Sequence, residues 1–157
     1  MAGITTSICN TFLRELLNGE HDLNSHTIKM ALIKASPSGT YNDETANYSD
    51  VTGNSDEASG TNYSAGGQQL DSVTISSISD TNSGNRAFVD IDNEVFSNVT
   101  CSADGCIIYN ASTTPANKAI AVFNFGSTIS ATAGDLTVTM PGPGTFGDAA
   151  VIRIANS

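Results

Sequence analysis

The sequence predicts a mainly β, single-domain protein, arranged as a β-sandwich or jelly-roll with one N-terminal amphipathic helix and a long polar loop. Three observations support this class. Ser, Thr, Asn and Gly make up 66 of the 157 residues. Apolar residues alternate with polar ones in short runs, and turn-forming clusters separate these runs at intervals of roughly 10 to 15 residues. Because Thr, Val and Ile favour strands and a chain of this length suits one domain, we expect residues 1–157 to form a single β domain.

The first element that we expect is a helix over residues 4–18. Apolar side chains recur every four residues and form one stripe, which consists of Ile4, Ile8, Phe12 and Leu16. Asn18 and Gly19 provide a left-handed stop at the end of the helix. A helix with one apolar face must pack either on its own sheet or on a neighbouring subunit, and the sequence leaves both possibilities open.

A strand over residues 27–35 and a long polar segment over residues 36–67 are expected next. The segment exceeds the length of ordinary connections in a compact domain. It could be a surface loop, or an arm that contacts a neighbouring subunit. We favour the arm, because Tyr41, Tyr48 and Tyr63 would supply rigid, amphipathic contact area.

The remainder of the chain is predicted to consist of short strands. Alternating or continuous apolar runs cover residues 69–78, 86–92, 94–100, 105–110, 118–125, 136–140 and 149–154. The Pro-Gly-Pro-Gly run at 141–144 ends the sixth of these runs.

Charge excludes one broad class of function. The formal net charge is −10, and the six Lys and Arg residues are scattered along the chain. A nucleic-acid-binding surface needs clustered basic charge, so we expect no nucleic-acid partner. We also expect no membrane partner, since no apolar run approaches the length of a membrane span, and we expect synthesis in a cytoplasm without an export signal.

No residue pattern predicts a catalytic, cofactor or metal site. His21 and His26 are expected to have surface or capping roles, because neither stands at a metal-ligand spacing from a cysteine. Asp90, Asp92 and Glu94 match the start of a calcium loop, but the glycine and glutamate that complete the loop are missing. We therefore expect a solvated face there, with a loose calcium site as the alternative.

The cysteines predict no disulfide framework. Their number is odd, and Cys101 and Cys106 could pair but would stay reduced in a protein assembled inside a cell. Cys106 lies within an apolar run and is expected to be a small core residue. Their redox state and any role in folding stay open at this point.

The order of several short motifs resembles small structural proteins of tailed-phage virions. The motifs are "LLNGEH" at residues 16–21, "TIKMAL" at 27–32, "GTNYSAGGQQL" at 60–70, "GCIIYN" at 105–110 and "KAIAVFNFG" at 118–126. Together they extend over nearly the whole chain. The segments at 82–85 and 101–106 depart from the family pattern.

The resemblance implies a non-enzymatic capsid decoration (cement) protein on the outer surface of the virion. It implies a homo-oligomer, with a trimer as the expected state, that binds the major capsid protein and carries no catalytic residues. The apolar stripe and the three tyrosines of the arm are the candidate interface residues. Two alternatives stay open: a tail or head-fibre component, such as a receptor-binding or fibre-base domain, and a carbohydrate-binding or lytic domain.

Overall fold

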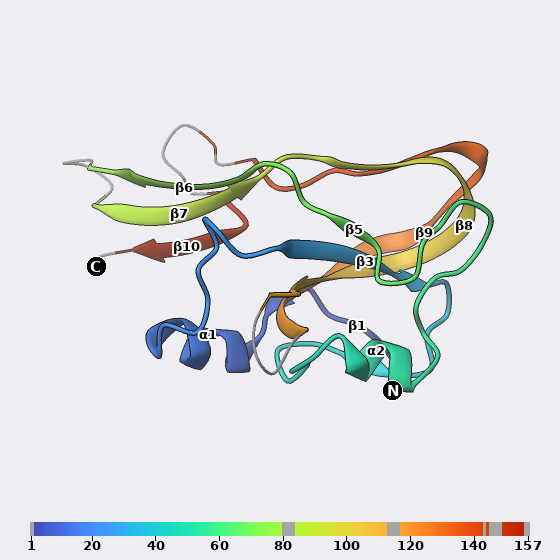
Figure 1. The fold of residues 1–157 in the computed structure, drawn as a ribbon, viewed down its shortest axis with the longest axis horizontal. Coiled ribbons are helices and arrows are strands. Elements are labelled where there is room, and N and C mark those ends of the chain that lie inside the picture. Colours follow the sequence, from blue (N-terminus) through green and yellow to red (C-terminus); the bar gives the residue numbers. More distant parts are fainter. Residues whose placement is uncertain (1, 80–83, 113–116, 143, 145–148, 156–157) are drawn as a thin grey trace. The chain divides into compact units, whose positions relative to one another are not determined.

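The protein is mainly β, with several antiparallel sheets, which confirms the mainly β part of the prediction (Figure 1). The computed structural model describes residues 2–79, 84–112, 117–142, 144 and 149–155. The chain divides into two compact units, which are described one at a time. The first unit comprises residues 1–69 and 96–136, and the second comprises residues 70–95 and 137–157. Neither of the helices in the described residues has the length and apolar composition needed to cross a bilayer.

A five-stranded sheet forms the centre of the first unit. Its strand order is β2-β9-β8-β3-β5, and the bounds are Ser7–Ile8 (β2), Lys118–Val138 (β9), Glu94–Asn110 (β8), Ile28–Lys34 (β3) and Gln68–Gln69 (β5). Strand β3 pairs with β8 in antiparallel register from Ile28 opposite Asn110 onward. The side chains of Met30, Leu32 and Ile107 are fully buried on these strands. The strand predicted over residues 27–35 is therefore confirmed and belongs to the core.

The N-terminal helix is shorter than predicted. Helix α1 spans Asn10–Leu17, and the residues before it form two short strands, β1 (Gly3–Ile4) and β2 (Ser7–Ile8). Strand β1 pairs in parallel with β4 (Thr40–Tyr41), and β2 pairs with β9. These sheet bonds satisfy backbone groups that a helix starting at residue 4 would have used, so Ile4 and Ile8 lie on strands. The predicted stop is correct, since Gly19 has φ +74° and its N–H bonds to the carbonyl of Leu16.

The segment over residues 36–67 is ordered on the first unit and contains β4 and a short helix, α2 (Ser49–Gly53). It returns to β3, where Glu57 forms a bridge with Ile33 and the Ala58 N–H bonds to the Leu32 carbonyl at 2.9 Å. Gly67 has φ +62°, and a Cβ there would lie 1.8 Å from the Met30 carbonyl oxygen. Only glycine fits this close approach.

Two pairs of predicted strands are continuous in the structure. Strand β8 joins the runs at 94–100 and 105–110. Strand β9 joins the run at 118–125 to the first residues of the run at 136–140 and ends at Val138. The polar residues between these runs were expected to turn. Instead their side chains bond across the two strands: Asp104 accepts from the Thr128 hydroxyl at 2.5 Å, and the hydroxyls of Ser102 and Ser130 are 2.7 Å apart.

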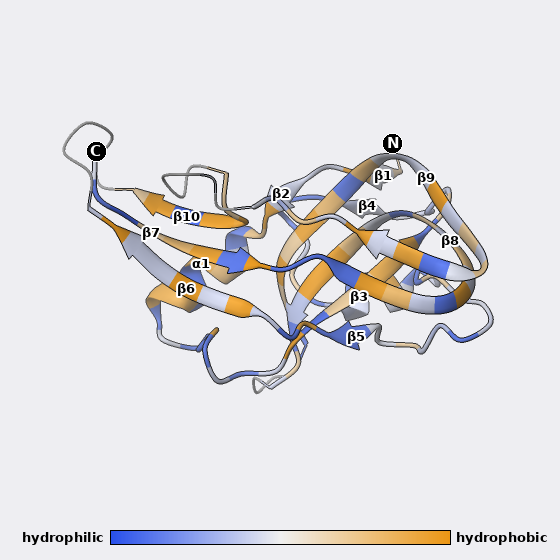
Figure 2. Cartoon of the chain, turned by 90° about the horizontal axis from the view of Figure 1, so that it is seen from above, coloured by the Kyte–Doolittle hydropathy of each residue, from blue (hydrophilic) through white to orange (hydrophobic). Residues whose placement is uncertain are grey.

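The second unit contains a three-stranded antiparallel sheet in the order β10-β7-β6. Its strands are β6 (Val73–Ile78), β7 (Arg86–Ile91) and β10 (Ile152–Ala155), which confirms strands near the predicted positions. Ile75, Val89 and Ile152 lie in one row across the sheet. Figure 2 shows apolar residues on all three strands: β10 alternates Ile152, Arg153 and Ile154, whereas β7 has a continuous apolar run from Ala87 to Val89.

Candidate functional site

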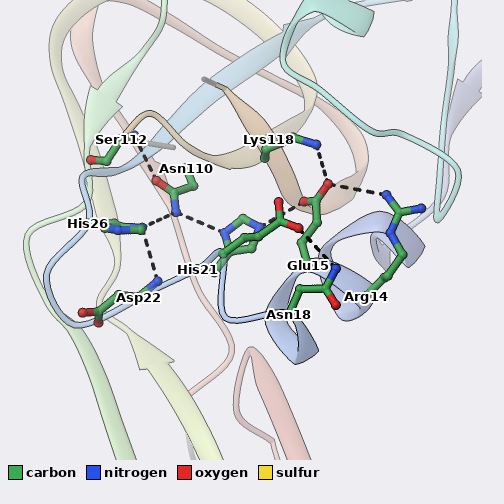
Figure 3. A network of polar contacts seen from close by, with 10 residues as sticks. Arg14, Glu15, Asn18, His21, Asp22, His26, Asn110, Ser112 and Lys118 are labelled. Carbon is green, nitrogen blue, oxygen red and sulfur yellow. Dashed lines mark hydrogen bonds and ion pairs between the residues drawn. The ribbon is translucent and has the colours of Figure 1, made fainter. Parts of the chain in front are cut away.

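The most concentrated group of ionisable side chains lies where α1 meets β8 and β9 (Figure 3). Glu15 is on the inner side of α1, and only 1% of its side chain is exposed. The Lys118 ammonium lies 2.5 Å from one of its oxygens, and His21 Nε2 lies 3.1 Å from the other. Arg14 approaches at 3.8 Å but is mostly exposed. Helix α1 therefore turns a carboxylate inward, where it is compensated by a cation from β9.

Asn110, at the end of β8, connects this group to two histidines. Its amide nitrogen donates to His21 Nδ1 at 3.1 Å and to His26 Nδ1 at 2.8 Å. Its amide oxygen accepts the Ser112 N–H at 2.9 Å. Glu15, His21, Asn110 and His26 thus form one chain of hydrogen bonds, which we call the Glu15–His26 network.

The electrostatics of the network favour a charged Glu15. Burial by itself would raise the pKa of this carboxyl, but hydrogen bonds from Lys118 and His21 outweigh it and lower the pKa. Glu15 is thus an acceptor at neutral pH, and His21 must donate through Nε2. This Glu-His arrangement orients an imidazole, as in hydrolases, but the far imidazole nitrogen faces the Asn110 amide rather than a nucleophile.

The thiols of the chain are not poised for chemistry. Cys9, Cys101 and Cys106 are free and buried. Burial, followed by the charges of Asp43 and Asp50, raises the pKa of Cys9 to about 12. Burial also raises the pKa of Cys101 and Cys106. Because the thiolate is the nucleophile, these thiols are inert in the folded protein.

The tyrosines of the 36–67 segment bind carboxylates of the same segment. The Tyr41 hydroxyl donates to Asp56 at 2.6 Å, and Asp56 is fully buried. The hydroxyls of Tyr48 and Tyr63 both donate to Glu57. These three side chains were predicted interface residues, but their hydroxyls hold the segment on its own unit.

The structure separates the predicted interface residues by burial. Ile4, Phe12 and Tyr41 are buried, so they are core residues here and we no longer place them in an interface. Ile8, Leu16, Tyr48 and Tyr63 are half-buried. On α1 the exposed apolar residues are instead Leu13, 46% exposed, and Leu17, 90% exposed. We call these two side chains the Leu13–Leu17 strip.

The predicted solvated face is found only in part, because Asp92 is exposed whereas Asp90 and Glu94 are half-buried. Asp90 lies on β7, Asp92 follows the strand and is exposed, and Glu94 begins β8. In the part of the chain that the structure describes, no group of three or more His, Cys, Asp or Glu side chains is placed to hold a metal ion.

A hollow of about 280 Å³ lies beside β1 and β9 in the first unit. Its polar lining includes Asp104, Asn124 and Thr128. Asp104 accepts from Thr128, and Asn124 donates to the Ile4 carbonyl at 2.6 Å. Each of these three side chains is engaged in a hydrogen bond within the first unit, so they serve as structural groups in the wall of the hollow.

Sequence reasoning missed two members of the Glu15–His26 network, and it also missed the lysine that pairs with Glu15. Glu15 and Lys118 were not singled out, and Asn110 was noted only within a strand motif. One signal was available: Glu15 stands three residues after Phe12, on the inner side of the helix. A glutamate in that position requires a buried cation, but the sequence does not show which lysine provides it.

Comparison with known proteins adds no relative. No protein-family model, curated protein or solved structure matches this chain. Function therefore has to be argued from the residues and the geometry alone.

Proposed function

We propose that this chain is a non-enzymatic structural protein of a tailed-phage virion, which binds the assembled capsid as a decoration (cement) protein. In this proposal it self-associates, with a trimer as the expected state, and its partner is the major capsid protein on the outer surface of the shell. The β-sandwich or jelly-roll-like architecture belongs to the same proposal. A protein that binds only the assembled lattice stabilises that lattice by mass action.

The observation that carries the proposal is the Leu13–Leu17 strip. A leucine side chain that is 90% exposed on a helix contributes almost no burial free energy to the fold of its own chain. Helix α1 is held rigidly beneath the strip by the buried Phe12 and by the ion pair between Glu15 and Lys118. A rigid helix that presents adjacent leucines loses little conformational entropy on binding, which suits a docking element.

Two further features support a protein-binding role outside the shell. The formal net charge of −10 disfavours contact with packaged DNA. In addition, the ionisable side chains of the Glu15–His26 network are paired with one another and with Lys118, and these bonds hold α1 on the central sheet. Repeated weak contacts would be multiplied by symmetric self-association.

The proposal is tested by binding to capsids purified without this protein. Leu17→Asp should reduce capsid occupancy at least about tenfold, since a charge replaces an apolar contact, while the free protein stays folded. Ile154→Asp is the matched control, because Ile154 is also an exposed apolar residue, 60% exposed, but lies on β10. Equal occupancy of wild type and Leu17→Asp would overturn the assignment of the strip.

The location and copy number in the virion test the wider proposal. A decoration protein is present at lattice positions in many copies, whereas a tail or head-fibre component is present in few. A virion reconstruction that places this chain at the tail alone would replace the first proposal with the second.

A further inference from the structure

We propose that His26 and Asn110 form a proton-sensitive latch, which holds the connection between α1 and β3 on the end of β8 and opens as the pH falls. The latch lies within the Glu15–His26 network (Figure 3). It is argued from hydrogen-bond directions and does not rest on the proposed function.

The orientation of the Asn110 amide is fixed by its surroundings. Its oxygen accepts the Ser112 N–H at 2.9 Å, so its NH2 group faces the two rings. One N–H is directed to His21 Nδ1 and the other to His26 Nδ1. The two hydrogens of one amide therefore hold two imidazoles, and the side chain of Asn110 is fully buried.

These bonds fix the protonation pattern of His26. Its Nδ1 accepts from Asn110 at 2.8 Å and from the backbone N–H of Asp22 at 3.2 Å. A nitrogen that faces two donors must be unprotonated, so the neutral ring carries its hydrogen on Nε2. A second proton can then bind only at Nδ1. A proton at Nδ1 would point at the Asn110 amide N–H and at the Asp22 backbone N–H, so both hydrogen bonds would be lost together.

His21 is constrained in the same way but is better protected. Its Nε2–H donates to Glu15, and its side chain is fully shielded from solvent. Glu15 is already paired with Lys118 from β9, and Arg14 lies 3.8 Å away. A proton on His21 would therefore add an uncompensated positive charge to a buried site.

Of the two rings, His26 is the one that solvent can reach. It is only half-buried. The pKa of the neighbouring Asp22 is lowered, chiefly by its hydrogen bonds from Ser25 and Asn24. Histidine is the side chain that in general changes charge between pH 5 and 8, so the latch is tested across that range.

Opening is expected to be local. The Thr27 N–H keeps its bond to the Ser112 hydroxyl at 2.6 Å, so β3 stays in the sheet. The turn over residues 22–26 loses its attachment to Asn110. Mild acid thus loosens the connection that follows α1 and leaves the core unchanged.

Hydrogen–deuterium exchange of the full chain tests the latch at pH 7.5 and pH 5.0, with rates corrected for the intrinsic effect of pH. Protection of peptides covering residues 18–27 should fall about tenfold or more at the lower pH, because two hydrogen bonds are lost. Peptides within β3 should be unchanged. No loss of protection over residues 18–27 would overturn the proposal.

Asn110→Asp is the decisive variant. Its carboxylate has the shape of the amide and still accepts from Ser112, but it accepts from a protonated ring instead of donating to a neutral one. The pH dependence over residues 18–27 should therefore reverse sign. Circular dichroism at pH 7.5 shows whether the variant is folded. If it is not, His26→Gln decides the question: loss of the response supports the latch, and an unchanged response overturns it.

Discussion

The rings of Tyr48 and Tyr109 stack face to face, with centroids 4.6 Å apart and planes inclined by 9°. Tyr48 immediately precedes α2, and Tyr109 lies in β8 of the central sheet. The Tyr48 hydroxyl donates to Glu57, and the Tyr109 hydroxyl donates to the Gly66 carbonyl at 2.8 Å. The stacked pair therefore fastens the 36–67 segment to the sheet at two points, and the segment is a structural part of the first unit.

Tyr48→Phe should destabilise the protein by about 1–3 kcal/mol, because it removes a hydrogen bond to a charged acceptor while keeping the stacked ring. Tyr109→Phe is the matched comparison, since its hydroxyl donates to a neutral carbonyl, and it should cost only about 1 kcal/mol. Urea unfolding of the two variants measures both values. A larger loss for Tyr109→Phe would contradict the importance that we assign to Glu57.

Stability should decline at alkaline pH. Burial, followed by the charge of Glu57, raises the pKa of Tyr109 to about 12, and burial with carboxylate contacts also raises the pKa of Tyr41, Tyr48 and Tyr63. A group whose pKa is raised by folding contributes stability that is complete below its unfolded pKa, about 10 for tyrosine, and is lost as the pH rises above it.

Two measurements check this alkaline dependence. The midpoint of urea unfolding should fall steadily above about pH 10, where unfolded tyrosines ionise. The ultraviolet absorbance of tyrosinate in the folded protein should appear only at higher pH than in the urea-unfolded chain. Tyrosinate formation near pH 10 in the folded state would show that the hydroxyls are not buried as described.

Asp56 should dominate the loss of stability in acid. Burial would raise the pKa of this carboxyl, but hydrogen bonds from Ser38, Tyr41 and Gly39 outweigh it and hold the pKa far below its usual range. Its stabilising effect is therefore present above the unfolded pKa of about 3.9 and is lost as the pH falls below that value.

Asp56→Asn should destabilise the protein at pH 7 by about 3 kcal/mol or more, since an amide NH2 group would face donors and Lys34 would lose its partner. The variant should also show a shallower decline in stability between pH 5 and pH 2. Unfolding midpoints across that range measure both effects. A variant with the acid dependence of wild type would show that other carboxylates are responsible.

Sequence patterns predicted some elements well for a clear physical reason. Strand β3 has alternating Ile28, Met30 and Leu32, and the pattern is determined by a core that contacts only this chain. Local signals also located the end of α1 at Asn18 and Gly19. The alternation along β3 and the Asn-Gly pair after α1 are carried by the residues of each segment itself, so the pattern is sufficient there even though β3 pairs with the distant β8.

Other elements depend on partners that are distant in the sequence. The stripe of Ile4 and Ile8 has helical spacing, yet the backbone at these positions bonds to β4 and β9. Glu15 is buried only because Lys118, 103 residues away, is there to pair with it. A local sequence pattern carries no information about such distant contacts, so the Glu15–His26 network was not predictable. Because Phe12 and Glu15 face inward, Leu13 and Leu17 lie on the exposed side of α1.

The ion pair between Glu15 and Lys118 should behave as a coupled unit. Lys118→Met leaves a buried carboxylate with His21 as its remaining close partner and should cost about 3–5 kcal/mol. Adding Glu15→Gln should recover part of this loss, because no uncompensated charge remains. A double-mutant cycle in urea measures the coupling, and simple additivity of the two single losses would contradict it.

The two faces of α1 should respond oppositely to substitution. Phe12 is fully buried and packs edge-on against His21, with ring centroids 4.9 Å apart. Phe12→Ala should therefore cost about 3–5 kcal/mol of folding stability through the cavity that it leaves. Leu17→Ala, on the exposed face, should change stability by less than about 0.5 kcal/mol. Thermal unfolding separates the two cases. A large loss for Leu17→Ala would mean that this side chain packs within the folded chain, and the Leu13–Leu17 strip would no longer be available to a partner.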